Sequence, residues 1–157
     1  MSGKGHTVAD VRPGLAPWEV RVFASWFDLV VVGLPALVPL GYALATAQPR
    51  GPGSDASDLT PAGIVAAWVA ILLYLGIWSW NRYVRTARTG QSWGKRRRGI
   101  TVRTVTGEVP SAGRLVARDL AHVLDVLPLF LGLLWPSWDR RRQTFADKIV
   151  GTVVTVA

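Results

Sequence analysis

The chain has no cysteine and few acidic residues, and these absences limit what it can do. Its 157 residues include ten Asp and Glu against eighteen Lys and Arg, and charged residues make up only 18%, compared with about a quarter in soluble domains. Without cysteine there is no disulfide or thiolate metal site, and so no indication of the redox compartment. His6 and His122 belong to no visible nucleophile, base or metal-ligand set. We therefore expect no enzyme activity, no metal and no cofactor.

Two long uncharged runs dominate the first half of the chain. Leu29–Ala47 and Ala62–Trp80 each contain nineteen residues without a charge, close to the ~20 that a helix needs to cross a bilayer. They predict transmembrane helices over about 22–47 and 62–81, and the eight Trp of the chain suit the membrane interface. A cleaved signal peptide ending near Ala47 is an alternative for the first run, but the run is long for such a peptide.

The segment that follows the second run is strongly basic. Arg82–Arg103 carries eight of the eighteen basic residues and no acid. Because Lys and Arg accumulate on the cytoplasmic side of membrane spans, this segment and the N-terminus are expected to face the cytoplasm, with the loop 48–61 outside. The net charge of +8 then suits an anionic inner leaflet as partner. A nucleic-acid patch is disfavoured, because no soluble nucleic-acid-binding fold surrounds the segment.

Two short β-branched stretches are expected to form a small cytoplasmic sheet. Ile100–Val105 follows the basic segment and Ile149–Val156 lies near the end of the chain, and pairing would give each an edge partner. At the other end, residues 1–19 are rich in Gly and Pro and are expected to form a flexible cytoplasmic arm.

The region 111–138 is predicted to associate with the membrane without a simple crossing. A helix is expected to start at Pro110-Ser111, with one polar stripe on its face. The uncharged run Val126–Trp138 is only thirteen residues long and basic residues follow it, so a crossing would place those charges outside. We expect an interfacial helix followed by a helix or re-entrant hairpin in the inner leaflet. A third true span with the C-terminus outside is the alternative. The members of the polar stripe are Arg114, Arg118, His122 and Asp125.

The candidate chemical site begins with Arg21 and Asp28. They are seven residues apart and therefore lie on one helix face, with Ser25 between them. A carboxyl group at the membrane boundary should meet a cation or be protonated, and arginines from 82–98 or 140–142 are available. The pair is either an ion or proton site or a structural ion pair, and the structural interpretation is favoured because neither span contains a second acid to continue a relay.

A second candidate is the glycine-rich turn within the basic segment. Gly90, Gly94 and Gly99 flank a run of four basic residues, a composition that could cradle a phosphate or a lipid headgroup. The pattern is not a P-loop, because Gly94-Lys95 is followed by Arg96, and a solvated basic face explains the same residues. The lipid-headgroup candidates are Lys95, Arg96, Arg97 and Arg98.

Three motifs in order resemble the RDD family of bacterial membrane proteins, from about residue 18 onward. The family is named for an arginine and two aspartates, and the matching positions are Arg21, Asp28 and Asp147. Members often carry His before the last Asp, where this chain has Ala146. The motifs are Arg21-x-x-Ala24-x-x-x-Asp28, then Gly90-Gln91-Ser92-Trp93-Gly94-Lys95-Arg96 leading into Gly99-Ile100-x-Val102, then Arg141-Arg142-Gln143-Thr144-Phe145-Ala146-Asp147-Lys148 leading into Gly151-Thr152-Val153-Val154.

The resemblance implies a multi-pass protein of the bacterial inner membrane. Transport has been proposed for some members of the family, and others accompany larger membrane machines, including lipid importers of actinobacteria. The Ala, Val, Arg and Gly richness of this chain suits a high-GC actinobacterium.

Together these observations predict an all-α membrane protein with two transmembrane helices, a third membrane-associated helical hairpin and a small cytoplasmic two-stranded element. We expect a non-catalytic accessory or assembly subunit of a larger membrane complex, such as a lipid-transport machine, which binds other membrane subunits or itself. The alternative is an oligomeric ion- or proton-coupled transporter component that uses Asp28. The predicted RDD-like domain covers 20–157, with a basic cytoplasmic stretch over 82–110, interfacial or re-entrant helices over 111–138, and a cytoplasmic motif and C-terminal strand over 139–157.

Overall fold

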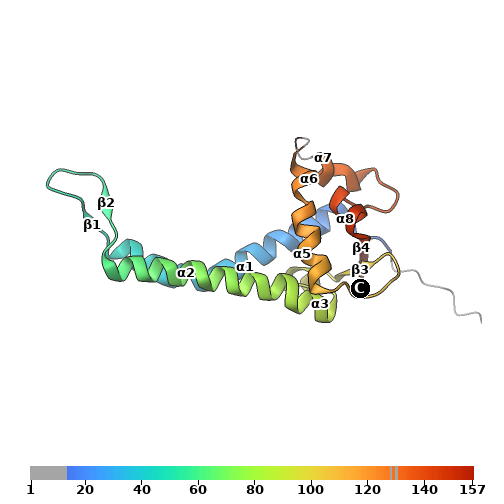
Figure 1. Cartoon of the computed structure of the whole chain (residues 1–157), viewed down its shortest axis with the longest axis horizontal. Coiled ribbons are helices and arrows are strands. Elements are labelled where there is room, and N and C mark those ends of the chain that lie inside the picture. Colours follow the sequence, from blue (N-terminus) through green and yellow to red (C-terminus); the bar gives the residue numbers. More distant parts are fainter. Residues whose placement is uncertain (1–13, 128, 130) are drawn as a thin grey trace, which may run out of the picture.

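Two long helices lie side by side and carry a small folded module at one end (Figure 1). The computed structural model describes residues 14–127, 129 and 131–157. Helix α1 spans Trp18–Ala45, and α2 spans Pro61–Ser79 and continues through a π-helical segment η1, Trp80–Arg85, into α3, Thr86–Thr89. With 28 and 29 residues, both helical runs are long and apolar enough to cross a membrane. At 1.5 Å per residue each is longer than the ~30 Å hydrocarbon thickness of a bilayer.

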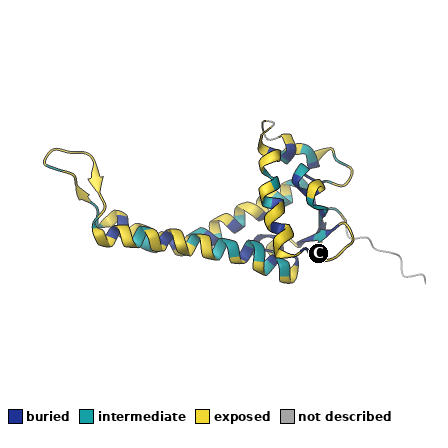
Figure 2. Cartoon of the chain, viewed as in Figure 1, coloured by how far each residue is buried: buried dark blue, intermediate teal, exposed yellow. Residues whose placement is uncertain are grey.

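The two helices pack through small residues and expose their large ones. Ala36 and Ala43 of α1 are buried, as are Gly63 and Ala70 of α2. The outward faces are aliphatic and aromatic and remain exposed (Figure 2). This pattern is the reverse of a soluble helical hairpin and is typical of helices that pack in lipid. The proline pair Pro35 and Pro39 lies inside α1 without ending the helix.

The loop between the two long helices is a short hairpin at the end far from the folded module (Figure 1). Strand β1, Gln48–Pro49, pairs antiparallel with β2, Ser57–Asp58. Arg50 forms an exposed ion pair with Asp58 at 2.7 Å. An exposed pair of this kind contributes little to stability.

The folded module is built around a two-stranded antiparallel sheet, as predicted. Strand β3, Ile100–Thr104, pairs with β4, Thr152–Val156, with Val102 opposite Val154. The second strand is shorter than expected, because residues 149 and 150 belong to helix α8, Phe145–Val150, which ends at Gly151 with φ 66°. The left-handed φ of this residue favours glycine and lets the chain turn directly from helix to strand.

The start of the described chain also joins this module. Residues 1–13, most of the predicted flexible arm including His6, lie outside the described residues. Leu15 forms a β-bridge with Thr155, and the Ala16 N–H donates to the Val154 carbonyl at 2.9 Å. The arm predicted for 1–19 is therefore wrong at its end, because Trp18 already opens α1. The core of the module contains Ala16, Ala24, Ile100, Val102, Leu115 and Val154.

Short helices connect the two strands of the module. The predicted basic stretch 82–110 includes the end of the second long helix and α4, Trp93–Arg97. Helix α5, Ala112–Ala121, starts as predicted, with Ser111 Oγ accepting from the Arg114 N–H, and is followed by α6, Val123–Val126. The chain then forms α7, Leu131–Leu134, and a 3-10 turn η2, Trp135–Ser137. The runs Ala112–Val126 and Leu131–Ser137 are bent by 111° relative to one another, and their depth in a membrane stays a prediction.

Candidate functional site

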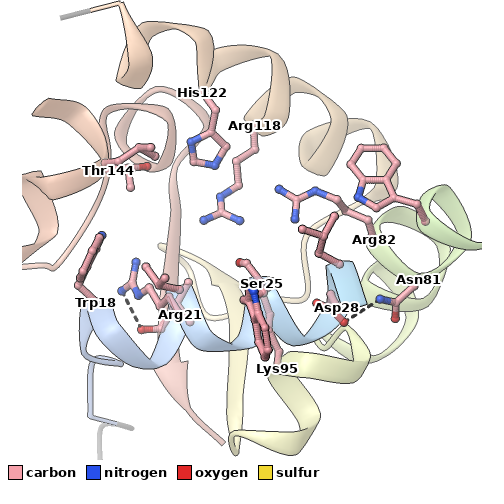
Figure 3. A pocket seen from close by; sticks show the side chains of 16 residues that line it. Trp18, Arg21, Ser25, Asp28, Asn81, Arg82, Lys95, Arg118, His122 and Thr144 are labelled. Atoms are coloured by element: carbon pink, nitrogen blue, oxygen red, sulfur yellow. Dashed lines mark hydrogen bonds between the residues drawn. The ribbon is translucent and has the colours of Figure 1, made fainter. Parts of the chain in front are cut away.

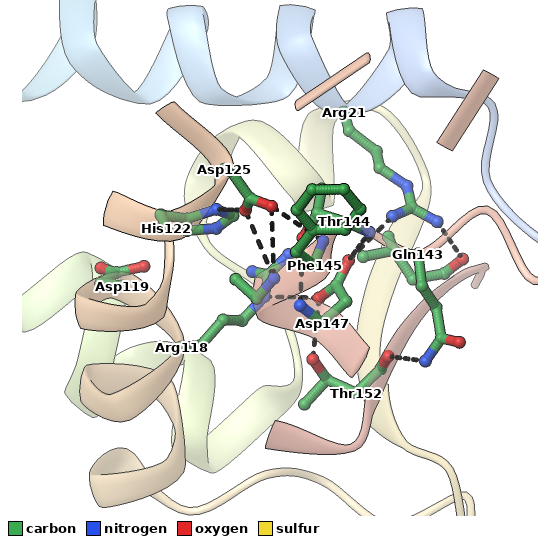
Figure 4. A network of polar contacts seen from close by, with 12 residues as sticks. Arg21, Arg118, Asp119, His122, Asp125, Gln143, Thr144, Phe145, Asp147 and Thr152 are labelled. Atoms are coloured by element: carbon green, nitrogen blue, oxygen red, sulfur yellow. Dashed lines mark hydrogen bonds and ion pairs between the residues drawn. The ribbon is translucent and has the colours of Figure 1, made fainter. Parts of the chain in front are cut away.

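Asp147 is the centre of the polar network that joins the module to α1 (Figure 4). Its side chain is fully buried. Its two carboxylate oxygens accept from Arg118 Nε at 2.6 Å and Arg21 Nη1 at 3.3 Å, and Thr152 Oγ1 also donates at 2.8 Å. One carboxylate therefore connects α1, α5 and β4. Burial by itself raises the pKa of Asp147, but Arg118 and Arg21 outweigh it and hold that pKa below its ordinary value.

The same aspartate also starts its own helix. Thr144 Oγ1 accepts from the Asp147 N–H at 3.0 Å, and Asp147 in turn accepts from the Thr144 N–H at 3.4 Å. This reciprocal capping box satisfies donors at the start of α8 that would otherwise have no partner. Asp147 therefore serves both the local helix and the long-range contact with Arg21.

Asp125 supplies a second buried carboxyl group at the start of α8. It accepts from the Phe145 N–H at 2.8 Å and from the Ala146 N–H, while His122 Nδ1 lies 2.6 Å from its other oxygen. Gly132 is required beside it, because a Cβ there would lie 2.5 Å from the Asp125 Cα. These contacts hold α6, α7 and α8 together.

A third ion pair connects the second long helix to the module. Arg82 in η1 donates through Nε and Nη2 to both oxygens of Asp119 in α5, and the Tyr83 hydroxyl donates to the same carboxylate at 3.0 Å. The π-helical turn widens the backbone here, and Thr86 Oγ1 donates to the Asn81 carbonyl at 3.0 Å. Such turns change which side chains share a helix face, and here they bring Asn81 and Arg82 into the site.

Asp28 forms no ion pair with an arginine of the described residues. The cation half of the prediction is therefore wrong there, and the protonation half stays a prediction. One oxygen of Asp28 accepts from Asn81 Nδ2 at 2.9 Å and from the Gly94 N–H at 2.7 Å, and the other accepts from Ser92 Oγ. Asn81 Oδ1 also accepts from the Trp93 N–H at 2.9 Å. Asp28 therefore fixes the start of α4 against α1 through neutral donors.

Two of the three glycines of the predicted phosphate cradle, Gly90 and Gly94, have packing roles. A Cβ on Gly94 would lie 1.9 Å from the Ala24 carbonyl oxygen, so only glycine lets α4 approach α1 this closely. Gly90 has φ 76°, and its Cβ would lie 2.4 Å from Thr101 Oγ1, while Gly99 has φ 62° with open space around it. Since the Gly94 N–H already donates to Asp28, it is not free to bind a phosphate.

The remaining basic residues singled out from the sequence lie mainly on the surface. The exposed members are Arg96, Arg97, Arg98 and Arg141. Arg98 stacks over Phe23 at 5.1 Å, and Arg142 Nη1 donates to the Leu15 carbonyl at 3.2 Å. None of these residues joins the Asp147 network, whereas Arg21 and Asp147 meet directly.

Lys95 is the exception in the basic run, because it is buried. Its Nζ lies 3.4 Å from Ser92 Oγ, and among the described residues no carboxylate oxygen comes within 4 Å of it. Burial, together with the neighbouring charges of Arg82 and Arg118, lowers the pKa of Lys95 from 10.5 to about 7, although Asp28 and Asp119 oppose the shift. An amine in this position gains or loses its charge near neutral pH.

These side chains surround a cavity of about 510 Å³ between α1, the end of the second long helix and the module (Figure 3). Its basic lining consists of Arg21, Arg82, Lys95 and Arg118. Trp18, Trp26 and Trp78 supply aromatic walls. Within the described residues, no three His, Asp or Glu side chains are grouped as a metal-ligand set.

Sequence reasoning missed the contributions of Arg118, Asp119 and Asp125. Arg118 and Asp125 were noticed as members of a polar stripe, but a polar stripe alone does not say whether it faces water or a second polar surface. Arg118 is 8% exposed and Asp125 is fully buried, so these two members of the stripe face inward, whereas Arg114 is exposed. The signal was the presence of both cations and a carboxyl group on the stripe.

Comparison with known proteins finds relatives in mycobacteria. The chain is 33% identical to the proline-rich antigen of Mycobacterium leprae over 150 residues, covering 87% of this chain and 59% of the relative. It is 32% identical to the proline-rich antigen homolog of Mycobacterium tuberculosis over 147 residues, covering 87% and 61%. The chain thus spans about three fifths of the length of these curated relatives. No solved structure matches it. The RDD family model matches residues 15–151, and the chain belongs to the RDD family.

Proposed function

We propose that this chain is a non-catalytic membrane subunit that assembles with other membrane proteins. The observation that carries the proposal is the use of Arg21, Asp28 and Asp147. All three form internal contacts that fasten the module to α1, and each aspartate oxygen already accepts at least one hydrogen bond. Side chains whose hydrogen-bonding atoms are all bound to other parts of the chain suit a structural role better than an ion path, because polar groups along an ion path must exchange partners.

The outer surface of the helical hairpin supports the same proposal. In the most apolar windows of the two long helices, only 22% and 11% of residues are buried within the chain. Two helices leave most of their apolar surface free for lipid or for neighbouring helices, and they enclose no pathway of their own. We propose that the partners include other membrane subunits or further copies of this chain. A lipid-transport machine is one candidate complex, because some members of the RDD family accompany such machines.

We further propose that the module faces the cytoplasm of a bacterium and that the hairpin crosses the inner membrane. The exposed arginines of α4 support this orientation, since positive charge concentrates on the cytoplasmic side. The loop 48–61 then lies outside. The mycobacterial source of the relatives supports an actinobacterial setting.

One observation favours a transporter component as the second candidate. Asp28 lines the cavity beside Lys95 near the end of the hairpin, where an ionisable group in a membrane protein often marks an ion path. In this alternative the chain is oligomeric and Asp28 exchanges an ion or a proton.

Purification from native membranes and reconstitution separate the two candidates. The affinity-tagged chain is isolated in mild detergent, and its stoichiometric partners are identified by mass spectrometry. The same chain and its Asp28→Asn variant are then placed in liposomes and tested for proton and sodium flux. A constant partner without flux supports the subunit, whereas flux that Asp28→Asn abolishes refutes it.

A further inference from the structure

The side chains that line the cavity between α1 and the module carry more positive than negative charge, with four cations and one carboxyl group, Asp28. Arg21 and Arg118 share the single carboxylate of Asp147, while Arg82 is matched by Asp119. Asp28 is held by neutral donors, and Lys95 has no carboxylate partner among the described residues. The buried carboxyl group of Asp125 lies beside His122 and accepts from backbone N–H groups, so it contacts none of these cations. Among the described residues, Lys95 is therefore the lining cation without a carboxylate contact, and a buried cation of this kind is costly unless an anion compensates it.

Several donors also point into the cavity without a partner. Arg118 donates to Asp147 only through Nε, so neither of its terminal nitrogens makes a hydrogen bond within the described chain. Arg82 donates to Asp119 through Nε and Nη2, so its Nη1 makes no hydrogen bond within the described chain. Figure 3 shows the guanidinium groups of Arg118 and Arg82 directed into the space above Ser25 and Lys95. Guanidinium and ammonium donors that converge from three elements suit a tetrahedral oxyanion.

The apolar side chains that line the cavity point to an amphiphilic ligand. Val22, Trp26 and Leu29 line it from α1, and they are 42%, 62% and 51% exposed. Tryptophan favours the level of lipid headgroups, and these residues lie in the first half of a membrane helix. An occupant is thus offered both cations and exposed apolar surface.

We propose that this cavity binds the phosphate group of an anionic lipid headgroup, held by Arg118, Lys95 and Arg82, with the acyl chains leaving along α1. The site differs from the exposed basic face of Arg96, Arg97 and Arg98, which lies on the outside of α4. The proposal does not depend on the role as an assembly subunit, since a transporter component would contain the same cavity.

Lys95→Gln is the variant that tests the site. It removes the unmatched charge, keeps a polar side chain of similar length, and leaves the Asp147 and Asp119 ion pairs untouched. The matched control is Arg97→Gln, which removes the same charge from the exposed face of the same helix. Thermal unfolding of both variants verifies that they fold, and Lys95→Gln should be at least as stable as the parent chain because it removes an unpaired buried charge.

Binding is measured on the full chain in uncharged detergent, with tryptophan fluorescence as the signal. The probes are phosphatidylglycerol in mixed micelles, phosphatidylcholine in the same micelles, and inorganic phosphate. We expect saturable binding of phosphatidylglycerol, weakened about 30-fold by Lys95→Gln and by about fivefold or less by Arg97→Gln. Phosphatidylcholine should bind much more weakly than phosphatidylglycerol.

Two results would overturn the proposal. Equal losses in the two variants would mean that anionic lipid is attracted by surface charge alone. If inorganic phosphate binds as tightly as phosphatidylglycerol, with the same sensitivity to Lys95→Gln, the site takes a free anion and the lipid assignment is wrong. Neither result bears on whether the chain has a protein partner, which the native purification decides separately.

Discussion

Replacing Asp147 by asparagine should destabilise the fold far more than the same replacement at Asp28. Asp147 is fully buried, and the two guanidinium groups that it pairs with are only 11% and 10% exposed. An amide keeps the volume but removes the charge, so Arg21 and Arg118 are left buried without a counterion. Breaking a buried ion pair in this way costs about 3–5 kcal/mol, a large part of the ~5–15 kcal/mol that stabilises a typical domain.

Asp28 is the matched control because its partners are neutral. In Asp28→Asn the remaining carbonyl oxygen can still accept from Asn81 and Gly94, and the new amide can donate to Ser92 Oγ, which now accepts. The expected loss is about 1 kcal/mol, the net value of one ordinary hydrogen bond.

The assay is denaturant unfolding in mild detergent, followed by tryptophan fluorescence. A double-mutant cycle of Asp147→Asn with Arg21→Gln should give a coupling energy of about 1–3 kcal/mol, because each single change already removes the same ion pair between Arg21 and Asp147. The reasoning is refuted if Asp147→Asn costs less than about 1 kcal/mol, or if the two asparagine variants lose the same stability.

Three further results are expected. Gly94→Ala should prevent the module from docking on α1, because the new Cβ would lie 1.9 Å from the Ala24 carbonyl oxygen. The expected result is a lower yield of folded protein in detergent for this variant than for the parent chain. The pKa of Lys95 in the folded chain, about 7, lies below its ordinary 10.5. Between these two pH values the folded chain binds fewer protons than the unfolded chain, so stability rises with pH there. Lys95→Met should flatten that rise in melting temperatures recorded from pH 7 upward. Since the chain lacks cysteine, Ser54→Cys should react with an impermeant maleimide on intact cells and Arg97→Cys only after permeabilisation, and the opposite labelling would reverse the orientation.

The sequence was most informative where a single segment determined the outcome. The uncharged runs predicted the two long helices, and β-branched residues predicted the pairing of Ile100–Thr104 with Thr152–Val156. The helix start at Ser111 was visible from its capping residue. In each case the signal depends on local composition or periodicity, which the tertiary structure does not override.

The site was less predictable because its contacts join distant segments. Many arginines were available as partners for Asp28, but its carboxyl oxygens accept hydrogen bonds from a serine, an asparagine and a backbone N–H instead. The π-helical turn at Trp80–Arg85, which aims Asn81 and Arg82 at the site, has no signature in the sequence. Lys95 looked like its three exposed neighbours, and only the packing of α4 against α1 separates it from them.

The proline pair inside α1 has a consequence for any neighbouring helix in the bilayer. Pro35 and Pro39 have no N–H, so the carbonyls of Val31 and Pro35 lose their usual donors one turn later. Val31 and Pro35 border a largely apolar recess of about 420 Å³ beside Ile77 and Trp80. A hydroxyl or amide side chain of another transmembrane segment that reached these carbonyls would supply the absent donors, and that segment would be joined to α1 by hydrogen bonds as well as by aliphatic contact.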